Sequence, residues 1–210
     1  MPKSSPPKKK RHPQIALVCG EAFQRLAKEF IPRIGEIEEG ALGDMSKEVG
    51  DLVACATNLA FAIELYLKGL LTHLDLPITQ NHDLRNLYDQ IPQAVRAIIE
   101  EVYDSFWPKQ LKPGRRTSFT LAKGPREEPL WDDHTKTSPA LPDLLARSRD
   151  SFQSWRYVFE YAQPKESPYQ FHKFEYGLLW CAAEAFRIEL IVRLQDTGDA
   201  PAPHLLEDES

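Results

Sequence analysis

One long helix constrains the fold of this chain more than any other segment. Between Lys47 and Leu74 the sequence contains no proline, and apolar side chains recur every three or four residues. The apolar positions are Leu52, Ala56, Leu59, Ile63, Leu67, Leu70, Leu71 and Leu74. Most of the stability of such a helix comes from burying its apolar face rather than from its own backbone. The segment therefore predicts the central helix of a packed helical domain.

Helical periodicity returns in several other parts of the chain. The further predicted helices span 15–39, 84–90, 93–103, 141–161 and 169–194. Pro32 should kink or break the first of these, because proline lacks a backbone N–H. Short connections between most neighbours favour antiparallel packing, so the expected fold is an all-α antiparallel helical bundle of about five to six helices.

The length of 210 residues fits one globular domain with tails. We expect a basic disordered tail at 1–13, a single helical domain at 14–195 and a flexible acidic tail at 196–210. The proline-rich segment at 106–142 predicts a long loop, which is uncommon inside a compact domain and is usually functional. A short strand at 117–121 is one alternative within it.

The composition limits the classes of function. The net charge is −5, and the basic residues from Lys8 to Arg11 lie in the N-terminal tail, which does not favour non-specific coating of nucleic acid. The sequence shows no signal peptide, and charged residues interrupt its longest apolar stretch. We therefore expect a cytoplasmic protein without membrane contact. In a eukaryote, Pro7 to Arg11 would resemble a nuclear-import signal.

The cysteines do not indicate a metal site. Cys19, Cys55 and Cys181 lie far apart among apolar neighbours, and no CxxC pair is present. This distribution is typical of buried, reduced thiols rather than of zinc ligands. The sequence also lacks the glycine-rich phosphate loops and the HExxH and GxSxG motifs. We expect neither a metal nor a cofactor.

A line of polar side chains interrupts the apolar surface of the central helix. Asn58, Glu64 and Lys68 fall near one side of the helix, and Glu64 precedes Lys68 by one turn. Polar groups on a buried helix either form a hydrogen-bond network that organises the fold or face a ligand. Both interpretations stay open, and the three residues are candidate ligand-binding residues.

A second polar cluster precedes the short helix predicted at 84–90. His82 and Asp83 stand directly before it. Asp83 can cap the helix N-terminus, and His82 then either packs against the long helix or serves in proton transfer.

A third cluster lies on the helix predicted at 141–161. Arg156 precedes Glu160 by one turn, and Tyr157 is adjacent. Arg156 and Glu160 can simply form an ion pair on the helix. The resemblance to a known family given below implies instead that these three residues, together with His82 and Asp83, form the candidate catalytic set.

The loop at 106–142 carries its own candidates. Arg115 and Arg116 lie in it together with two tryptophans, a combination that can clamp and stack on nucleic acid. The alternative is that the tryptophans dock on the core and the arginines are simply solvated. The loop could also bind a protein partner.

The order and spacing of these motifs resemble those of the HEPN superfamily of helical domains. The resemblance rests on the string Asn58-x2-Phe61-Ala62-x-Glu64-Leu65-x-Leu67-Lys68-x2-Leu71, on His82-Asp83-Leu84-x2-Leu87-Tyr88-x2-Ile91-Pro92, and on Trp155-Arg156-Tyr157-x2-Glu160. It covers roughly 47–92 and 141–194 of the chain.

The resemblance implies a helical domain that is commonly a homodimer and often cleaves RNA without a metal. The usual HEPN ribonuclease motif is Arg-x4-6-His, and none of the six histidines here has an arginine at that spacing. The expected function is RNA- or nucleotide-directed processing or defence. The chain would be an active or degenerate ribonuclease, or part of a toxin–antitoxin or antiviral system. The alternative is a non-catalytic protein–protein interaction or regulatory module.

Overall fold

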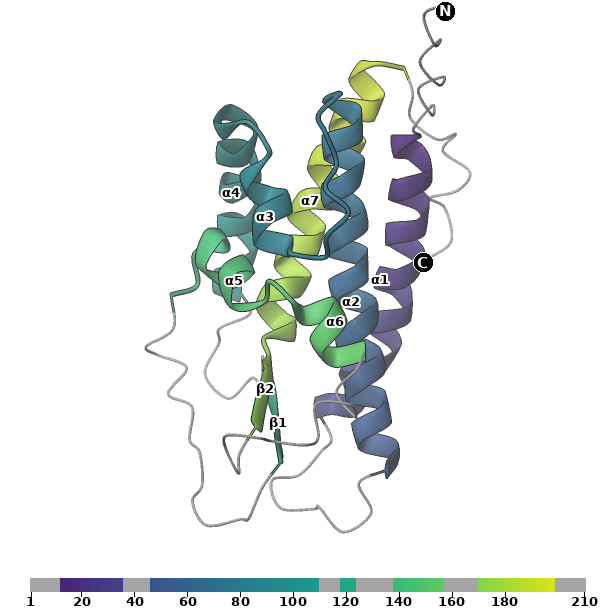
Figure 1. The fold of residues 1–210 in the computed structure, drawn as a ribbon, viewed down its shortest axis with the longest axis vertical. Coiled ribbons are helices and arrows are strands. Elements are labelled where there is room, and N and C mark those ends of the chain that lie inside the picture. The colour runs from purple at the N-terminus through teal and green to yellow at the C-terminus, as the bar shows by residue number, and fades with distance from the viewer. Residues whose placement is uncertain (1–11, 36–45, 110–117, 124–137, 157–169, 199–210) are drawn as a thin grey trace, which may run out of the picture.

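The computed structural model describes residues 12–35, 46–109, 118–123, 138–156 and 170–198 of the chain (Figure 1). The elements in chain order are α1 (Pro13–Gly35), α2 (Ser46–His73), α3 (Leu84–Asp89), α4 (Gln93–Phe106), the 3-10 helix η1 (Trp107–Lys109), β1 (Phe119–Lys123), α5 (Leu141–Arg147), α6 (Ser151–Arg156), β2 (Gln170–Phe174) and α7 (Tyr176–Asp196). The predicted all-α class is confirmed, and the two short strands form one small addition to it.

Helix α2 is the centre of the fold, as its apolar stripe predicts. It packs against α1, α7, α6 and α3. Helices α1 and α2 run in opposite directions, whereas α7 runs in the same direction as α2 (Figure 1). The stripe residues from Ala56 to Leu71 are all fully buried. Burial of each large apolar side chain contributes roughly 1.5–3 kcal/mol relative to an exposed position.

Two glycines let the long helices approach each other closely. A Cβ atom at Gly20 of α1 would lie 2.4 Å from Cε1 of Tyr66 on α2. A Cβ atom at Gly69 of α2 would lie 2.7 Å from Cδ2 of Leu190 on α7. The lack of a side chain at these positions therefore sets the spacing of α1, α2 and α7.

Part of α2 also meets a simple criterion for a membrane span. Between Gly50 and His73 the helix is long and apolar enough to cross a membrane by length and composition alone. Half of its apolar stretch is buried inside the protein, and the core helix of a soluble fold can be equally long and apolar. This feature therefore carries no conclusion about membranes.

The cysteines agree with the expectation of buried thiols at two of three positions. Cys55 and Cys181 are buried, Cys19 is half-buried, and all three are free. Burial raises the pKa of the Cys55 thiol to about 12. Cys55 is therefore protonated at neutral pH and unreactive while the protein is folded.

The helix predicted at 141–161 is broken in the structure. A turn at 148–150 separates α5 from α6, which ends at Arg156 within the described residues. The backbone C=O of Arg149 leaves the helical pattern and accepts a hydrogen bond from the N–H of Leu84, at 3.0 Å. A distant segment thus competes for a helical carbonyl, and local periodicity cannot reveal that competition.

The helix predicted at 169–194 starts later than expected. Residues 170–174 instead form strand β2, which pairs antiparallel with β1 in the register Phe119↔Phe174 to Lys123↔Gln170. The predicted strand at 117–121 therefore exists, two residues further along the chain. Its partner could not be predicted because the pairing joins segments far apart in sequence.

The remaining boundaries are close to the predictions. Helix α1 continues through Pro32 to Gly35, so the predicted break is wrong. The helix continues for three residues after Pro32, so the loss of that one backbone N–H does not end α1. The 3-10 helix η1 extends α4 by one turn, as far as Lys109.

Candidate functional site

A buried carboxylate lies at the middle of α2. The Glu64 side chain is 1% exposed. Burying a carboxylate without partners is costly, so such a group is retained only where cations and donors surround it. Lys68, one turn further along α2, donates from Nζ to Oε1 of Glu64 at 2.6 Å and is itself 23% exposed. The ammonium group therefore compensates the buried charge while reaching the surface.

His82 binds the same carboxylate from another part of the chain. Its Nδ1 atom lies 2.8 Å from Oε2 and 3.0 Å from Oε1 of Glu64. An ionised carboxylate only accepts hydrogen bonds, so Nδ1 is the donor and Nε2 of the neutral ring carries the free lone pair. The His82 side chain is 36% exposed. This is the arrangement of an imidazole base that a carboxylate orients.

Aromatic rings fix the plane of the His82 imidazole. The ring of Phe152 on α6 lies 5.1 Å from the His82 ring, centroid to centroid. Phe152 stacks on Phe61 of α2 at 4.8 Å, and Phe61 meets Phe23 of α1 edge to face at 4.7 Å. The histidine is therefore packed on one side and bound to Glu64 by Nδ1.

Arg156 shares the same aromatic ring. Its guanidinium carbon lies 5.7 Å from the centre of the Phe152 ring, and its side chain is exposed. The arginine and the histidine thus both contact Phe152. The Phe152 ring is therefore a contact that the cation and the imidazole share.

Asp83 has a different role from its neighbour His82. Its Oδ1 atom accepts the backbone N–H of Asn86 at 2.9 Å, which caps α3, and its Oδ2 atom pairs with the guanidinium of Arg149. Burial acts to raise the pKa of Asp83, but the Asn86 N–H and Arg149 outweigh it and lower that pKa below its ordinary value of 3.8. Asp83 is therefore ionised at neutral pH and acts as a cap and an ion-pair partner.

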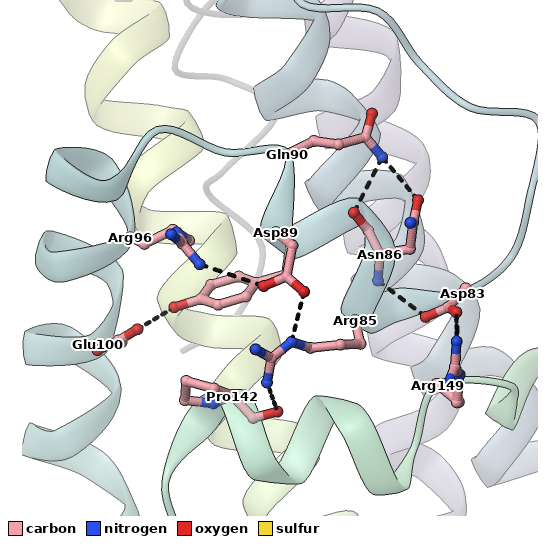
Figure 2. A network of polar contacts seen from close by, with 10 residues as sticks. Asp83, Arg85, Asn86, Asp89, Gln90, Arg96, Glu100, Pro142 and Arg149 are labelled. Carbon is pink, nitrogen blue, oxygen red and sulfur yellow. Dashed lines mark hydrogen bonds and ion pairs between the residues drawn. The ribbon is translucent and has the colours of Figure 1, made fainter.

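Helix α3 is held on its outer side by a polar network (Figure 2). Arg85 donates from Nε to Asp89 at 2.8 Å and from Nη1 to the C=O of Pro142 at 2.6 Å. Arg96 of α4 reaches Asp89 at 3.3 Å, and Tyr88 donates to Glu100 of α4. These bonds join α3 to α4 and to the start of α5.

The other predicted site residues stand as follows. Asn58 is half-buried on α2. Tyr157, Glu160, Arg115 and Arg116 lie outside the described residues. The structure thus brings together Glu64, Lys68 and His82, and Arg156 contacts the Phe152 ring on which His82 packs.

Sequence reasoning missed two residues that complete this site. Arg149 and Phe152 both fall within the helix predicted at 141–161, and neither is among the candidate residues. No local pattern marks Arg149, because its partner Asp83 lies 66 positions away. The contact of Arg149 with Asp83 and that of Phe152 with His82 are seen only in the tertiary structure.

Within the described ranges, no group of three His, Cys, Asp or Glu side chains is placed to hold a metal ion. The arrangement is that of a proton-transfer pair with nearby cations. A scan against models of known families found no match, and neither did comparisons with curated proteins and with solved structures.

Proposed function

We propose that this chain is a HEPN-like protein of RNA- or nucleotide-directed processing, with His82 as a metal-independent general base. The observation that carries the proposal is the 2.8 Å contact between His82 Nδ1 and the buried carboxylate of Glu64. That contact leaves Nε2, on a side chain 36% exposed, as the acceptor for a proton.

The proposed chemistry uses three side chains. The Nε2 atom of His82 would take the proton of a ribose 2′-hydroxyl as that oxygen attacks the adjacent phosphorus. The bond from phosphorus to the 5′-oxygen breaks, and the 5′-oxygen leaves with a proton from water, which gives a 2′,3′-cyclic phosphate. Glu64 would stabilise the imidazolium that forms, in the manner of a carboxylate behind a catalytic histidine. Arg156 would offset the additional negative charge on the phosphate oxygens.

The HEPN resemblance supports the same class of function. It rests on one string that contains Glu64 and Lys68 and on a second that begins with His82, and these three side chains meet in space. By the same resemblance we propose a homodimer acting in processing, toxin–antitoxin or antiviral defence. We also propose that it acts in the cytoplasm, as the sequence led us to expect. Light scattering of the purified protein tests the dimer, and a strict monomer would contradict that part.

A non-catalytic interaction module is the second candidate, and one observation favours it. Glu64 is paired with Lys68 and Asp83 with Arg149, so the charges of the cluster largely neutralise each other. A fully satisfied polar network of this kind can simply organise the packing of α2, α3 and α6.

One experiment separates the two candidates. Purified wild-type protein is incubated with mixed RNA in EDTA and compared with His82→Ala, Arg156→Ala and Glu64→Gln. We expect cleavage by the wild type, and a loss of roughly 10²-fold or more without the histidine, which is the usual contribution of a general base. Intact RNA at all wild-type concentrations, with the protein folded by circular dichroism, would contradict the ribonuclease proposal.

Matched variants control for contamination and for changes in surface charge. His73→Ala removes the half-buried histidine at the end of α2, and Arg25→Ala removes an exposed arginine of α1. Both are purified by the same route, and both should retain wild-type cleavage. Equal loss of cleavage in His73→Ala and His82→Ala would show that the loss is not specific to the His82 site.

A further inference from the structure

We propose that Arg149 is a positioning residue, which holds His82 against Glu64 by fixing Asp83 and the start of α3. The catalytic meaning of this inference rests on the proposed function, but its geometry does not. Arg149 lies in the turn between α5 and α6, and the contacts on either side of His82 support the role.

Arg149 holds the chain just after His82 with both its side chain and its backbone. Its guanidinium binds Oδ2 of Asp83, with Nε at 3.1 Å. Its backbone C=O accepts the N–H of Leu84 at 3.0 Å. Two successive residues after the histidine are therefore tied to one residue of the turn.

The same turn leads directly to the ring that packs on His82. Phe152 lies in the first turn of α6, three positions after Arg149, and is 8% exposed. Its ring contacts both the His82 imidazole and the ring of Phe61 on α2. The segment 149–152 thus contacts residues 82–84 through Arg149 and Phe152. The buried Glu64 carboxylate of α2 binds His82 separately.

The two oxygens of Asp83 divide these tasks between them. Oδ1 caps α3 through the N–H of Asn86, and Oδ2 receives Arg149. Arg149 is 58% exposed, and exposed ion pairs add little to overall stability. The consequence of the pair is therefore geometric, because it fixes the direction in which the chain passes from His82 into α3.

Part of the connection is held without Arg149. The side-chain amide of Asn81 donates to Asn86 at 3.2 Å, and Thr79 donates to Asn81 at 3.0 Å. These bonds lie before His82, whereas those of Arg149 lie after it. Removing the Arg149 side chain should therefore free the imidazole without unfolding α3.

The test measures the tautomer of His82 by 15N NMR of its imidazole, at a pH where the spectrum shows the neutral ring. In the wild type we expect Nδ1 to carry the proton because it faces Glu64. In Arg149→Ala we expect a shift towards the Nε2–H tautomer and a loss of the ring-current shift from Phe152. Arg149→Lys, which retains a cation for Asp83, should restore most of the wild-type signal.

The matched control is Arg85→Ala, which removes another arginine bound to α3 but not to Asp83 or His82. It should leave the His82 signals unchanged. Unchanged signals in a folded Arg149→Ala protein would overturn the proposal, as would equal shifts in Arg85→Ala. If Arg149→Ala does not fold, Asp83→Asn decides in the same way, because asparagine keeps the cap but weakens the bond to Arg149.

The result is independent of the proposed function. A tautomer shift in Arg149→Ala together with no RNA cleavage by the wild type would support the positioning role and contradict the ribonuclease proposal. Cleavage by the wild type together with an unchanged tautomer in Arg149→Ala would support the ribonuclease proposal and contradict the positioning role.

Discussion

The Nδ1 atom of His82 lies 2.8 Å from Oε2 of Glu64, across 18 positions of sequence. This contact joins the middle of α2 to the segment that leads into α3. It also places the only buried acid of α2 within the described residues beneath a half-exposed histidine. The stability and chemistry of this part of the protein therefore depend on one carboxylate.

Removing that carboxylate should destabilise the fold. Glu64→Ala leaves Lys68 and His82 without their acceptor, but both side chains reach solvent and can be hydrated in part. We therefore expect a loss of about 1–3 kcal/mol in the free energy of unfolding, below the ~3–5 kcal/mol typical of a fully buried pair. Urea denaturation measures it. Glu101→Ala, an exposed position on α4, is the control and should change little.

Glycine substitutions on α1 and α2 should have opposite signs. Gly20→Ala forces a Cβ atom to 2.4 Å from the Tyr66 ring, and we expect a loss of about 1–3 kcal/mol from overpacking. Gly50→Ala meets nothing within 4 Å and should gain about 0.5–1 kcal/mol from helix propensity. Thermal unfolding of both variants checks this, and a stabilised Gly20→Ala protein would contradict the close packing of α1 on α2.

Two buried hydroxyls on α2 offer a second matched pair. Tyr66 donates to Oε1 of buried Gln24 at 2.7 Å, so Tyr66→Phe should cost about 1–3 kcal/mol by leaving that acceptor unpaired. The Thr57 hydroxyl is buried with no partner among the described residues. Thr57→Val should therefore be neutral or stabilising. Chemical denaturation of both variants gives the comparison, and equal losses would contradict it.

The stability that Asp83 contributes should depend on pH. Its folded-state pKa lies below the ordinary value of 3.8, so the folded protein binds fewer protons than the unfolded chain in that range. The contribution is therefore complete above 3.8 and is lost as the pH falls through the folded-state pKa. We expect wild type to exceed Asp83→Asn in unfolding free energy at neutral pH, and the difference to shrink in acid.

The same experiment on Arg149→Ala identifies the source of that pH dependence. Without the guanidinium, one of the groups that lower the pKa of Asp83 is absent. The acid-sensitive part of the stability should then be smaller than in the wild type. An identical pH profile in both proteins would assign the effect to the helix cap alone.

The central part of the fold could be predicted from the sequence for a simple reason. The spacing of apolar residues from Leu52 to Leu74 is a local property, and it determines which face of α2 must be buried. The cap at Asp83 is local as well, because its acceptor and the Asn86 N–H are three residues apart. Glu64, Lys68 and His82 could be predicted as candidate residues because the patterns that mark them also lie within short stretches of sequence.

The rest depended on contacts between distant segments. The break between α5 and α6, the pairing of β1 with β2 and the ion pair of Arg149 with Asp83 each join residues far apart along the chain. In each case a tertiary hydrogen bond outweighs the local helix preference. The sequence by itself determined a helical core around α2 and the polar residues on it. Only the tertiary structure decided that His82 meets Glu64, because the two residues lie 18 positions apart and come together only when the segment before α3 packs against α2.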